Sequence, residues 1–298
     1  MKQYAHTSFR LTFFFLLLVP AYLISNLVNA SEEESDKQAN ENRIVKAPPA
    51  DFYPRYLADP RSARTAFTLM GIFNSDIDDT GDLRFNFSYG KRFGLVRFGD
   101  EQTYKAWQLD LEIGYFGHFD IDNSLDNIGW DGLFGLYFSR RLSPKKFIRF
   151  GFLHDSAHLG DEFVEKTGRQ RIDYTRQELI AGMTWLPTPR SKLYTELGWA
   201  YGLKGSQEPL RWQWGAEYYG THNDNYLGLP WYAATDLTLF EERDWEPAIT
   251  LQLGLIYATG RATERYRFVL EAYSGRSVLG EFSFEDESYI SIGVHYDH

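Results

Sequence analysis

The stretch WQLDLEIGYFGHFD, residues 107–120, alternates between two kinds of side chain over its whole length. Its odd-numbered positions are almost all apolar or aromatic, whereas its even-numbered positions include Gln108, Asp110, Glu112 and His118. Because successive side chains of a strand point to opposite faces, this segment forms one apolar and one polar surface. A long strand that separates rings from charges is typical of a wall between lipid and a polar lumen.

The same period of two recurs along the chain from residue 65, for example in 83–89, 193–201 and 249–257. Turn-forming residues separate about twelve such segments, and a closed barrel takes an even number of strands. We therefore predict an all-β fold, a transmembrane antiparallel up-and-down β-barrel. Its strands are expected at 65–74, 82–90, 106–119, 129–141, 146–157, 174–186, 191–203, 211–220, 231–240, 246–258, 265–274 and 287–297. The segment FGLVRF at 93–98 is a candidate for one more, which gives a range of about ten to fourteen strands.

A soluble β-sandwich or lipocalin-like barrel is the alternative fold, because it also shows a period of two. Three features favour the membrane barrel: long strands, Tyr and Trp near strand ends, and charges of both signs on the polar face. Aromatic residues make up 17% of the chain while charged residues still make up 24%. A soluble domain would place most of these rings in a core, but here rings and charges alternate.

The N-terminal 30 residues have the pattern of a secretory signal peptide. Lys2 and Arg10 precede an apolar run over 11–24, and Val28 and Ala30 supply the small residues before the expected cleavage site after Ala30. An uncleaved anchor helix is the alternative, although the run is short for a membrane span of about 20 residues. Removing residues 1–30 takes away two positive charges and shifts the formal net charge from −10 to −12. Such an acidic chain is not expected to bind nucleic acid.

Three segments follow from this organisation: a signal peptide at 1–30, a periplasmic acidic and proline-punctuated tail at 31–64, and the barrel at 65–298. The first half of the tail has few apolar residues and is expected to be unstructured, whereas 56–61 is expected to dock. The short connections at 142–145 and 187–190 are predicted to be periplasmic turns. The longer ones at 158–173 and 275–286 are predicted to be extracellular. The chain has no cysteine, which excludes disulfides and thiol chemistry.

The stretch FLHDSAHLGDEF at 152–163 holds the candidate catalytic residues. Arg149 is expected to face the lumen, so His154 and Ser156, at the other parity, project toward lipid near the outer rim. Two residues of rise place their backbones about 5.5 to 7 Å apart, so that the imidazole can take the serine proton. Gln177, on the lipid-facing parity of the next strand, is one candidate to orient His154, and Asp161 and Glu162 are others. The alternative is a polar rim that binds lipid head groups.

Two groups of residues are candidate metal ligands, since imidazole and carboxylate groups are suitable donors. The first group would bind zinc or another divalent ion and consists of His154, His158, Asp161 and Glu162. The second lies in the loop DIDDTGD at 76–82, which partly resembles a calcium loop through Asp76, Asp78 and Asp82. Position twelve of that loop is Phe87 instead of the expected glutamate, so the EF-hand pattern fails. A second acidic loop at 120–126 is predicted on the same rim, and solvated turns are the alternative for both loops.

Charged residues of both signs occupy the lumen-facing parity of the predicted strands. We expect them to form ion pairs that fill a narrow barrel, because a wide porin needs about 16 strands. The residues are Arg84, Asp110, Glu112, Arg149, Arg176, Glu178, Glu196, Arg211, Glu217, Arg267 and Glu271.

The chain resembles a bacterial family known only as Domain of Unknown Function 1207. The matching stretches are YLADPR at 56–61, WQLDLEIGYFGHFDID at 107–122, HDSAHLGDEF at 154–163, GLKGSQEPLRWQWGAEYY at 202–219, EERDWEP at 241–247 and YSGRSVLGEFSFEDESYISIG at 273–293. This resemblance implies a surface-exposed or outer-membrane barrel and no assigned activity. Separately, the pair His154 and Ser156 resembles the His-x-Ser pair of outer-membrane phospholipase A and of the lipid A deacylase barrels. Those enzymes follow the serine with asparagine, whereas this chain has Ala157.

Three functional hypotheses follow for a monomeric barrel in the outer membrane of a Gram-negative-type cell, with outer-membrane lipids as partners. The first is a non-catalytic envelope barrel with a filled polar lumen. The alternative is a lipid acyl-ester hydrolase of the phospholipase or lipid A deacylase type, with Ser156 as nucleophile and His154 as base. The second alternative is a narrow channel. The sequence establishes no cofactor, and calcium is the candidate.

Overall fold

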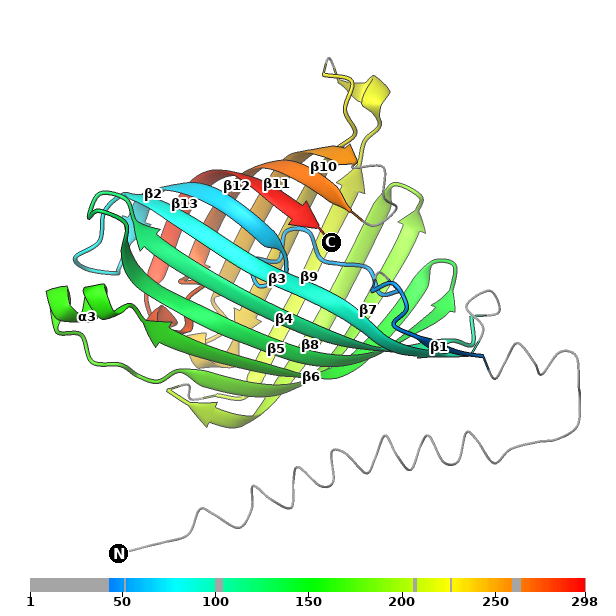
Figure 1. Ribbon diagram of the computed structural model, residues 1–298, viewed down its shortest axis with the longest axis horizontal. Coiled ribbons are helices and arrows are strands. Elements are labelled where there is room, and N and C mark those ends of the chain that lie inside the picture. The colour runs from blue at the N-terminus through cyan, green and yellow to red at the C-terminus, as the bar shows by residue number, and fades with distance from the viewer. Residues whose placement is uncertain are drawn as a thin grey trace, which may run out of the picture. The chain divides into compact units, whose positions relative to one another are not determined.

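The computed structural model describes residues 43–50, 52–99, 104–205, 208–225, 227–258 and 264–297 (Figure 1). The predicted signal peptide and the first part of the predicted tail lie outside these residues. The described residues form one antiparallel 13-stranded sheet in which β3 also pairs with β4. This pairing closes β2 to β13 into a twelve-stranded barrel, as predicted. No helix in these ranges is long and apolar enough to span a membrane.

The strands β2 to β13 join in an up-and-down order, each pairing with its neighbour along the chain, and short helices lie in the connections. The strands are β1 Ile44–Lys46, β2 Thr65–Ser75, β3 Leu83–Phe98, β4 Trp107–Asp120, β5 Asp126–Ser143, β6 Lys146–Leu159, β7 Thr175–Thr188, β8 Ser191–Lys204, β9 Leu210–Tyr219, β10 Trp231–Phe240, β11 Pro247–Ala258, β12 Arg265–Arg276 and β13 Asp286–Asp297. The helices are α3 Asp161–Thr167 and the 3-10 turns η1 His222–Asp224, η2 Glu241–Arg243 and η3 Gly280–Phe282.

The segment 93–98 is the end of β3, so its interpretation as a further separate strand is wrong. A bulge between Gly94 and Val96 lets β3 continue past the length of its partner β2. The edge of β3 that β2 leaves free is covered by β1, which pairs with Val96–Phe98. The three-residue β1 was not predicted, because a segment this short has no detectable period.

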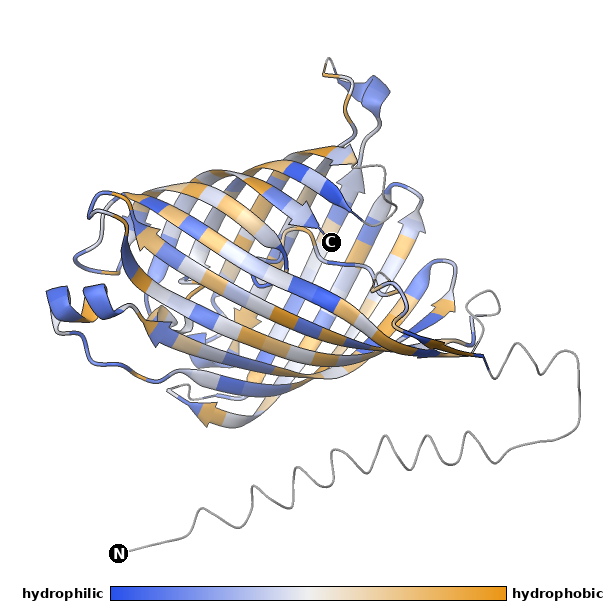
Figure 2. Cartoon of the chain, viewed as in Figure 1, coloured by the Kyte–Doolittle hydropathy of each residue, from blue (hydrophilic) through white to orange (hydrophobic). Residues whose placement is uncertain are grey.

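Apolar residues and many of the rings lie on the outer face of the barrel, whereas charges and several tyrosines lie on the inner face. Figure 2 shows the corresponding alternation of hydrophobic and hydrophilic residues along the strands. On the outer face Trp199, Leu251 and Ile292 are 50 to 59% exposed. On the inner face all the predicted lumen charges are buried. A soluble sandwich would bury the apolar face instead, so this arrangement contradicts the alternative fold.

The direction of the strands divides the connections between two rims. The predicted extracellular connections, which contain α3 and η3, lie together on one rim, and the tight turns at 142–145 and 187–190 lie on the other. The connection between β9 and β10 is long but lies on the rim of the tight turns. We call the rim that carries α3 and η3 the outer rim.

Residues 52–64, called the plug segment below, lie buried against the inner wall of the barrel. The Leu57 amide donates to Glu217 on β9 at 2.8 Å. Tyr56 stacks on Tyr194 of β8 with ring centroids 3.8 Å apart, and Thr184 of β7 donates to the Tyr53 hydroxyl at 3.0 Å. The stretch 56–61 therefore docks, as expected, and it docks inside the lumen.

Ion pairs fill the remaining lumen, which confirms the predicted filled interior. Arg149 and Arg211 both bind Glu196, at 2.6 and 3.0 Å. Arg211 also binds Glu178, at 2.9 Å, and this carboxylate in turn binds Arg176. Together with the plug segment, these pairs leave a cavity of about 110 Å³ in the described lumen.

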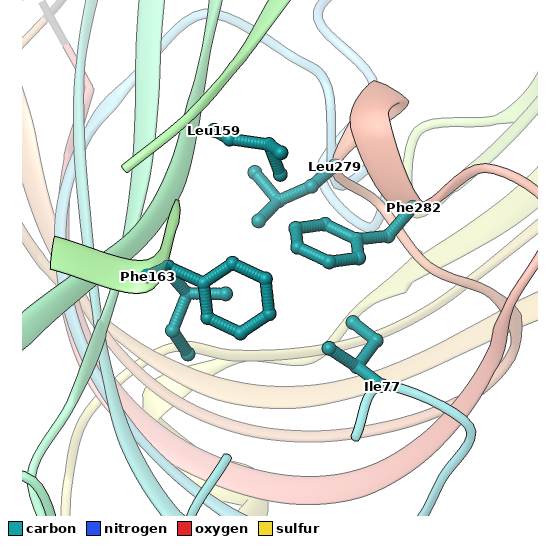
Figure 3. Close-up of a cluster of buried hydrophobic side chains, with 6 residues drawn as sticks. Ile77, Leu159, Phe163, Leu279 and Phe282 are labelled. Atoms are coloured by element: carbon teal, nitrogen blue, oxygen red, sulfur yellow. The ribbon is translucent and has the colours of Figure 1, made fainter. Parts of the chain in front are cut away.

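A small apolar cluster, called the cap cluster below, lies on the outer rim. It joins Phe163 of α3, Leu279 and Phe282 of the β12–β13 connection, and Ile77, Ile128 and Leu159. Figure 3 shows these side chains gathered around one centre, and the rings of Phe163 and Phe282 meet edge to face at 5.4 Å. Burial of these residues fixes α3 and the β12–β13 connection to the rim.

Candidate functional site on the outer wall

Strand β6 carries the candidate residues on its outward face. Arg149 is buried in the lumen, and the side chains at the opposite parity, His154, Ser156 and His158, are half-buried on the wall. All three lie in the half of β6 that ends at the outer rim. His154 and Ser156 thus point out of the barrel, as the sequence predicts.

The register of β5, β6 and β7 sets the neighbours of these residues. His154 pairs with Gln177 on β7 and with Phe134 on β5. Ser156 pairs with Thr175 on β7 and with Gly132 on β5. Directly paired residues on one face have Cβ atoms about 4.5 to 5.5 Å apart. The strands therefore bring His154, Ser156 and Gln177 together on one face.

The hydroxyl of Ser156 donates to the Gly132 carbonyl at 3.5 Å, which is a long hydrogen bond. Within the described residues, no hydrogen bond joins Ser156 to His154 or His154 to Gln177. Such contacts are often long without substrate and tighten when it binds. Proton transfer therefore requires the Ser156 hydroxyl to leave the Gly132 carbonyl and to turn toward His154.

Two glycines lie beside these residues, and they differ in how much room they leave. A Cβ built on Gly132 would lie 3.4 Å from Ser156 Oγ and 3.7 Å from the indole of Trp130. A Cβ on Gly202, the β8 partner of Gln177, would lie 3.2 Å from the amide carbon of Gln177. The Gln177 side chain thus lies close over Gly202, and the wall is open above Gly132.

Aromatic rings border the site on two sides. Toward the outer rim, His158 stacks on Trp130 at 4.1 Å, and Trp130 stacks on Tyr115 at 5.5 Å. Toward the middle of the wall, Phe134 meets Phe152 edge to face at 6.3 Å. An acyl chain in the bilayer would lie along this second set of rings, whereas a polar head group would lie toward the rim.

The plug segment supports the same strands from inside. Arg61 binds Asp131 of β5 at 2.7 Å and Asp155 of β6 at 2.5 Å. Asp155 lies between His154 and Ser156 in the chain, with its side chain on the lumen side. Sequence reasoning missed this link, because nothing in the sequence pairs Arg61 with particular strands.

The other two candidates to orient His154 lie elsewhere. Asp161 and Glu162 belong to the first turn of α3 and are exposed. The Asp161 carboxylate binds Arg171 at 2.9 Å, so it is already paired. Nearby on the rim, a hydrogen bond from Lys204 lowers the pKa of the exposed Asp173 carboxyl. Gln177 is therefore the orienting residue that the register favours.

The candidate metal ligands are not gathered into a site. In the ranges that the structure describes, no three His, Asp or Glu side chains lie close enough to hold a metal ion. His158 stacks on Trp130, and Asp76 accepts the Asp286 amide at 3.2 Å. The acidic loops 76–82 and 120–126 do meet on the rim, where Asp120 accepts the Gly81 amide at 2.9 Å. These contacts stabilise the two turns against each other. Among the described residues, Asp78, Asp82 and Glu162 do not join the other candidate ligands around a common point.

The family described as "Protein of unknown function (DUF1207)" matches residues 34–298. The chain belongs to this family. No curated protein matches the sequence. Among solved structures, an active-site mutant of outer membrane phospholipase A from Escherichia coli is similar at a TM-score of 0.53 and 10% identity. The match covers 83% of this DUF1207 chain and 93% of that chain.

A second similar structure is the Salmonella typhi outer membrane phospholipase dimer with bound calcium. Its TM-score is 0.55 at 11% identity, and the match covers 80% of this chain and 93% of that one. At this identity the likeness shows the fold alone. The DUF1207 chain therefore has the fold of an outer-membrane barrel.

Proposed function

We propose that this DUF1207 protein hydrolyses acyl esters of membrane lipids on its outer wall, with Ser156 as nucleophile, His154 as general base and Gln177 as the residue that orients His154. The observation that carries this proposal is the register of β6 and β7, which pairs His154 with Gln177 and places Ser156 one step further along the same face. A nucleophile, a base and an orienting amide are the three parts that such catalysis requires. The similar barrels include outer membrane phospholipases, which supports the same reaction class.

The reaction follows from these positions. His154 takes the Ser156 proton while Oγ forms a bond to the ester carbonyl carbon, and the carbonyl electron pair moves to oxygen. Collapse of this intermediate expels the alcohol, which takes the proton from His154 and leaves an acyl-serine. Water, activated by His154 in the same way, then releases the fatty acid and restores Ser156. The side-chain carbonyl of Gln177 accepts a hydrogen bond from the N–H of the far ring nitrogen of His154 and thereby holds the ring plane.

The proposed setting is the outer membrane of a Gram-negative-type cell, reached with a signal peptide cleaved after Ala30. Lipids are the substrates because the site faces the bilayer, at the rim where ester groups lie. The filled lumen gives no comparable support to the channel hypothesis, since the plug segment and the ion pairs occupy the path. A non-catalytic envelope barrel is the function that would remain if the site proves inactive.

The test is hydrolysis by the purified protein in detergent, with and without calcium. The substrates are phosphatidylethanolamine in mixed micelles and lipid A, and released fatty acid is measured. The wild type is compared with Ser156→Ala and with Ser274→Ala, a matched serine on the outer wall of β12. The proposal expects hydrolysis in the wild type and Ser274→Ala and its loss in Ser156→Ala. Equal turnover in all three proteins, or turnover in none, refutes it.

A further inference from the structure

The space above Gly132 is bounded by the nucleophile on one side and by an aromatic ring on the other. A methyl group there would touch both Ser156 Oγ, at 3.4 Å, and Trp130, at 3.7 Å. The backbone of Gly132 lies in a regular strand and does not have the positive φ that only glycine adopts readily. The conformation of the chain therefore does not require glycine here, but an open space beside Ser156 does.

A second histidine faces the same space. His158 lies two residues beyond Ser156 on the outward face of β6, on the side away from His154. Its ring is stacked on Trp130 with an interplanar angle of 25°. Stacking fixes the plane of the imidazole and leaves the ring nitrogens at its edge, where they can form hydrogen bonds. The hydrolase proposed above uses His154 and leaves His158 without a role.

Ester hydrolysis requires a donor for the charge that develops on the carbonyl oxygen. Backbone amides of a closed sheet are already used in the ladder, so a side chain is the donor that the protein itself can supply at this site. Ser156 therefore lies between two imidazoles with different surroundings. One is paired with the amide of Gln177, and the other is held by Trp130.

We infer that the space above Gly132 is the subsite for the ester carbonyl and that His158 is a catalytic residue, whose ring N–H donates a hydrogen bond to the oxyanion. This inference rests on the proposed hydrolase and assigns it an acyl ester whose chain runs along Phe134 and Phe152. During attack His158 keeps its proton and only donates the hydrogen bond, while His154 accepts the proton of Ser156. The two histidines thus have separate tasks.

Two substitutions of His158 separate hydrogen bonding from stacking. His158→Phe keeps a flat ring on Trp130 and removes the donor, whereas His158→Gln keeps a donor and removes the ring. Loss of one oxyanion donor lowers kcat by about 10² to 10³. We expect this loss in His158→Phe with KM changed by less than about threefold, and a recovery of about tenfold or more in His158→Gln.

Gly132→Ala tests the subsite itself, with Ala181→Val on the outer face of β7 as the control for added apolar volume. We expect kcat/KM on phosphatidylethanolamine to fall at least about tenfold in Gly132→Ala and to stay near wild type in the control. Folding of every variant is verified by the heat-dependent shift of barrel mobility in SDS gels. If His158→Phe does not fold, His158→Gln and Gly132→Ala decide the question.

The possible failures are distinguishable. If Ser156→Ala is inactive but His158→Phe keeps wild-type kcat, the inference is wrong and the hydrolase stands. Equal losses in His158→Phe and His158→Gln would show that stacking matters and donation does not, which also overturns the inference. Wild-type activity in Gly132→Ala removes the subsite. Hydrolysis that persists in Ser156→Ala removes both proposals.

Discussion

Arg61→Ala is the substitution whose effect on stability follows most directly from the structure. Arg61 is the only cation that the described contacts place on both Asp131 and Asp155, at 2.7 and 2.5 Å. The Asp131 side chain is 1% exposed, and its second described partner is the Gly280 amide at 2.9 Å. Asp155 is 21% exposed and can be hydrated. Removing Arg61 therefore leaves one buried carboxylate without a counter-charge.

The cost of breaking a buried ion pair from one side is about 3 to 5 kcal/mol, and almost all of it should come from Asp131. Replacing that carboxylate as well, in Arg61→Ala with Asp131→Asn, removes the unpaired charge and should restore about half of the lost stability. The control is Arg171→Ala, which breaks an exposed pair with Asp161 and should cost less than about 1 kcal/mol.

The assay is equilibrium unfolding by urea in detergent micelles, followed by tryptophan fluorescence. The reasoning predicts the order wild type, Arg171→Ala, double variant and Arg61→Ala, from most to least stable. A loss of less than about 1 kcal/mol in Arg61→Ala would show that the plug segment does not hold β5 and β6 together. A double variant no more stable than Arg61→Ala would show that the buried charge is not the cause.

Three further predictions concern the lumen, the cap cluster and the wall. Deletion of residues 52–64 should raise single-channel conductance in planar bilayers well above that of the intact protein, because the plug segment occupies the lumen; unchanged conductance contradicts a plug. Phe282→Ala should lower the free energy of unfolding by about 3 to 5 kcal/mol, whereas Phe284→Ala, at a 40% exposed position, should change it little. Leu251→Arg on the lipid face of β11 should cost about 2 to 4 kcal/mol in lipid vesicles, and Leu227→Arg in a connection should cost almost nothing; equal effects would argue against a bilayer around this wall.

The strands were predictable because each carries its own signal. In 107–120 the alternation fixes both the strand and its two faces, and β4 spans those residues. The elements that were not predicted show no alternation of apolar and polar residues in their own sequence. The helix α3, in the β6–β7 connection, was not predicted. Its Phe163 packs on Phe282, which is more than 100 residues away in the chain. Contacts of this kind depend on the closed rim and leave no pattern in a short segment.

The sequence predicts which side of the strands the candidate site residues occupy, but it does not predict the register between the strands. Parity alone places His154, Ser156 and Gln177 on one side of their strands. Parity does not say which residue of β7 lies opposite His154. A shift of the β6–β7 register by two residues leaves every side chain on the same face of the sheet. The structure resolves this through the β6–β7 connection, in which α3 is fixed to the rim by the cap cluster. The position of Gln177 opposite His154 is thus a consequence of tertiary packing.

The inner and outer faces of the barrel differ in whether packing explains their polar side chains. In the lumen, Arg149 and Arg211 are paired with Glu196, and this pairing accounts for their presence in a filled barrel. On the outer wall polar side chains are costly in lipid, and packing of the barrel does not require them. His154, Ser156 and Gln177 occupy adjoining positions on that wall, among rings that would suffice to face the bilayer. The proposed ester hydrolysis gives this cluster of costly groups a role, and the loss of turnover expected in Ser156→Ala tests it.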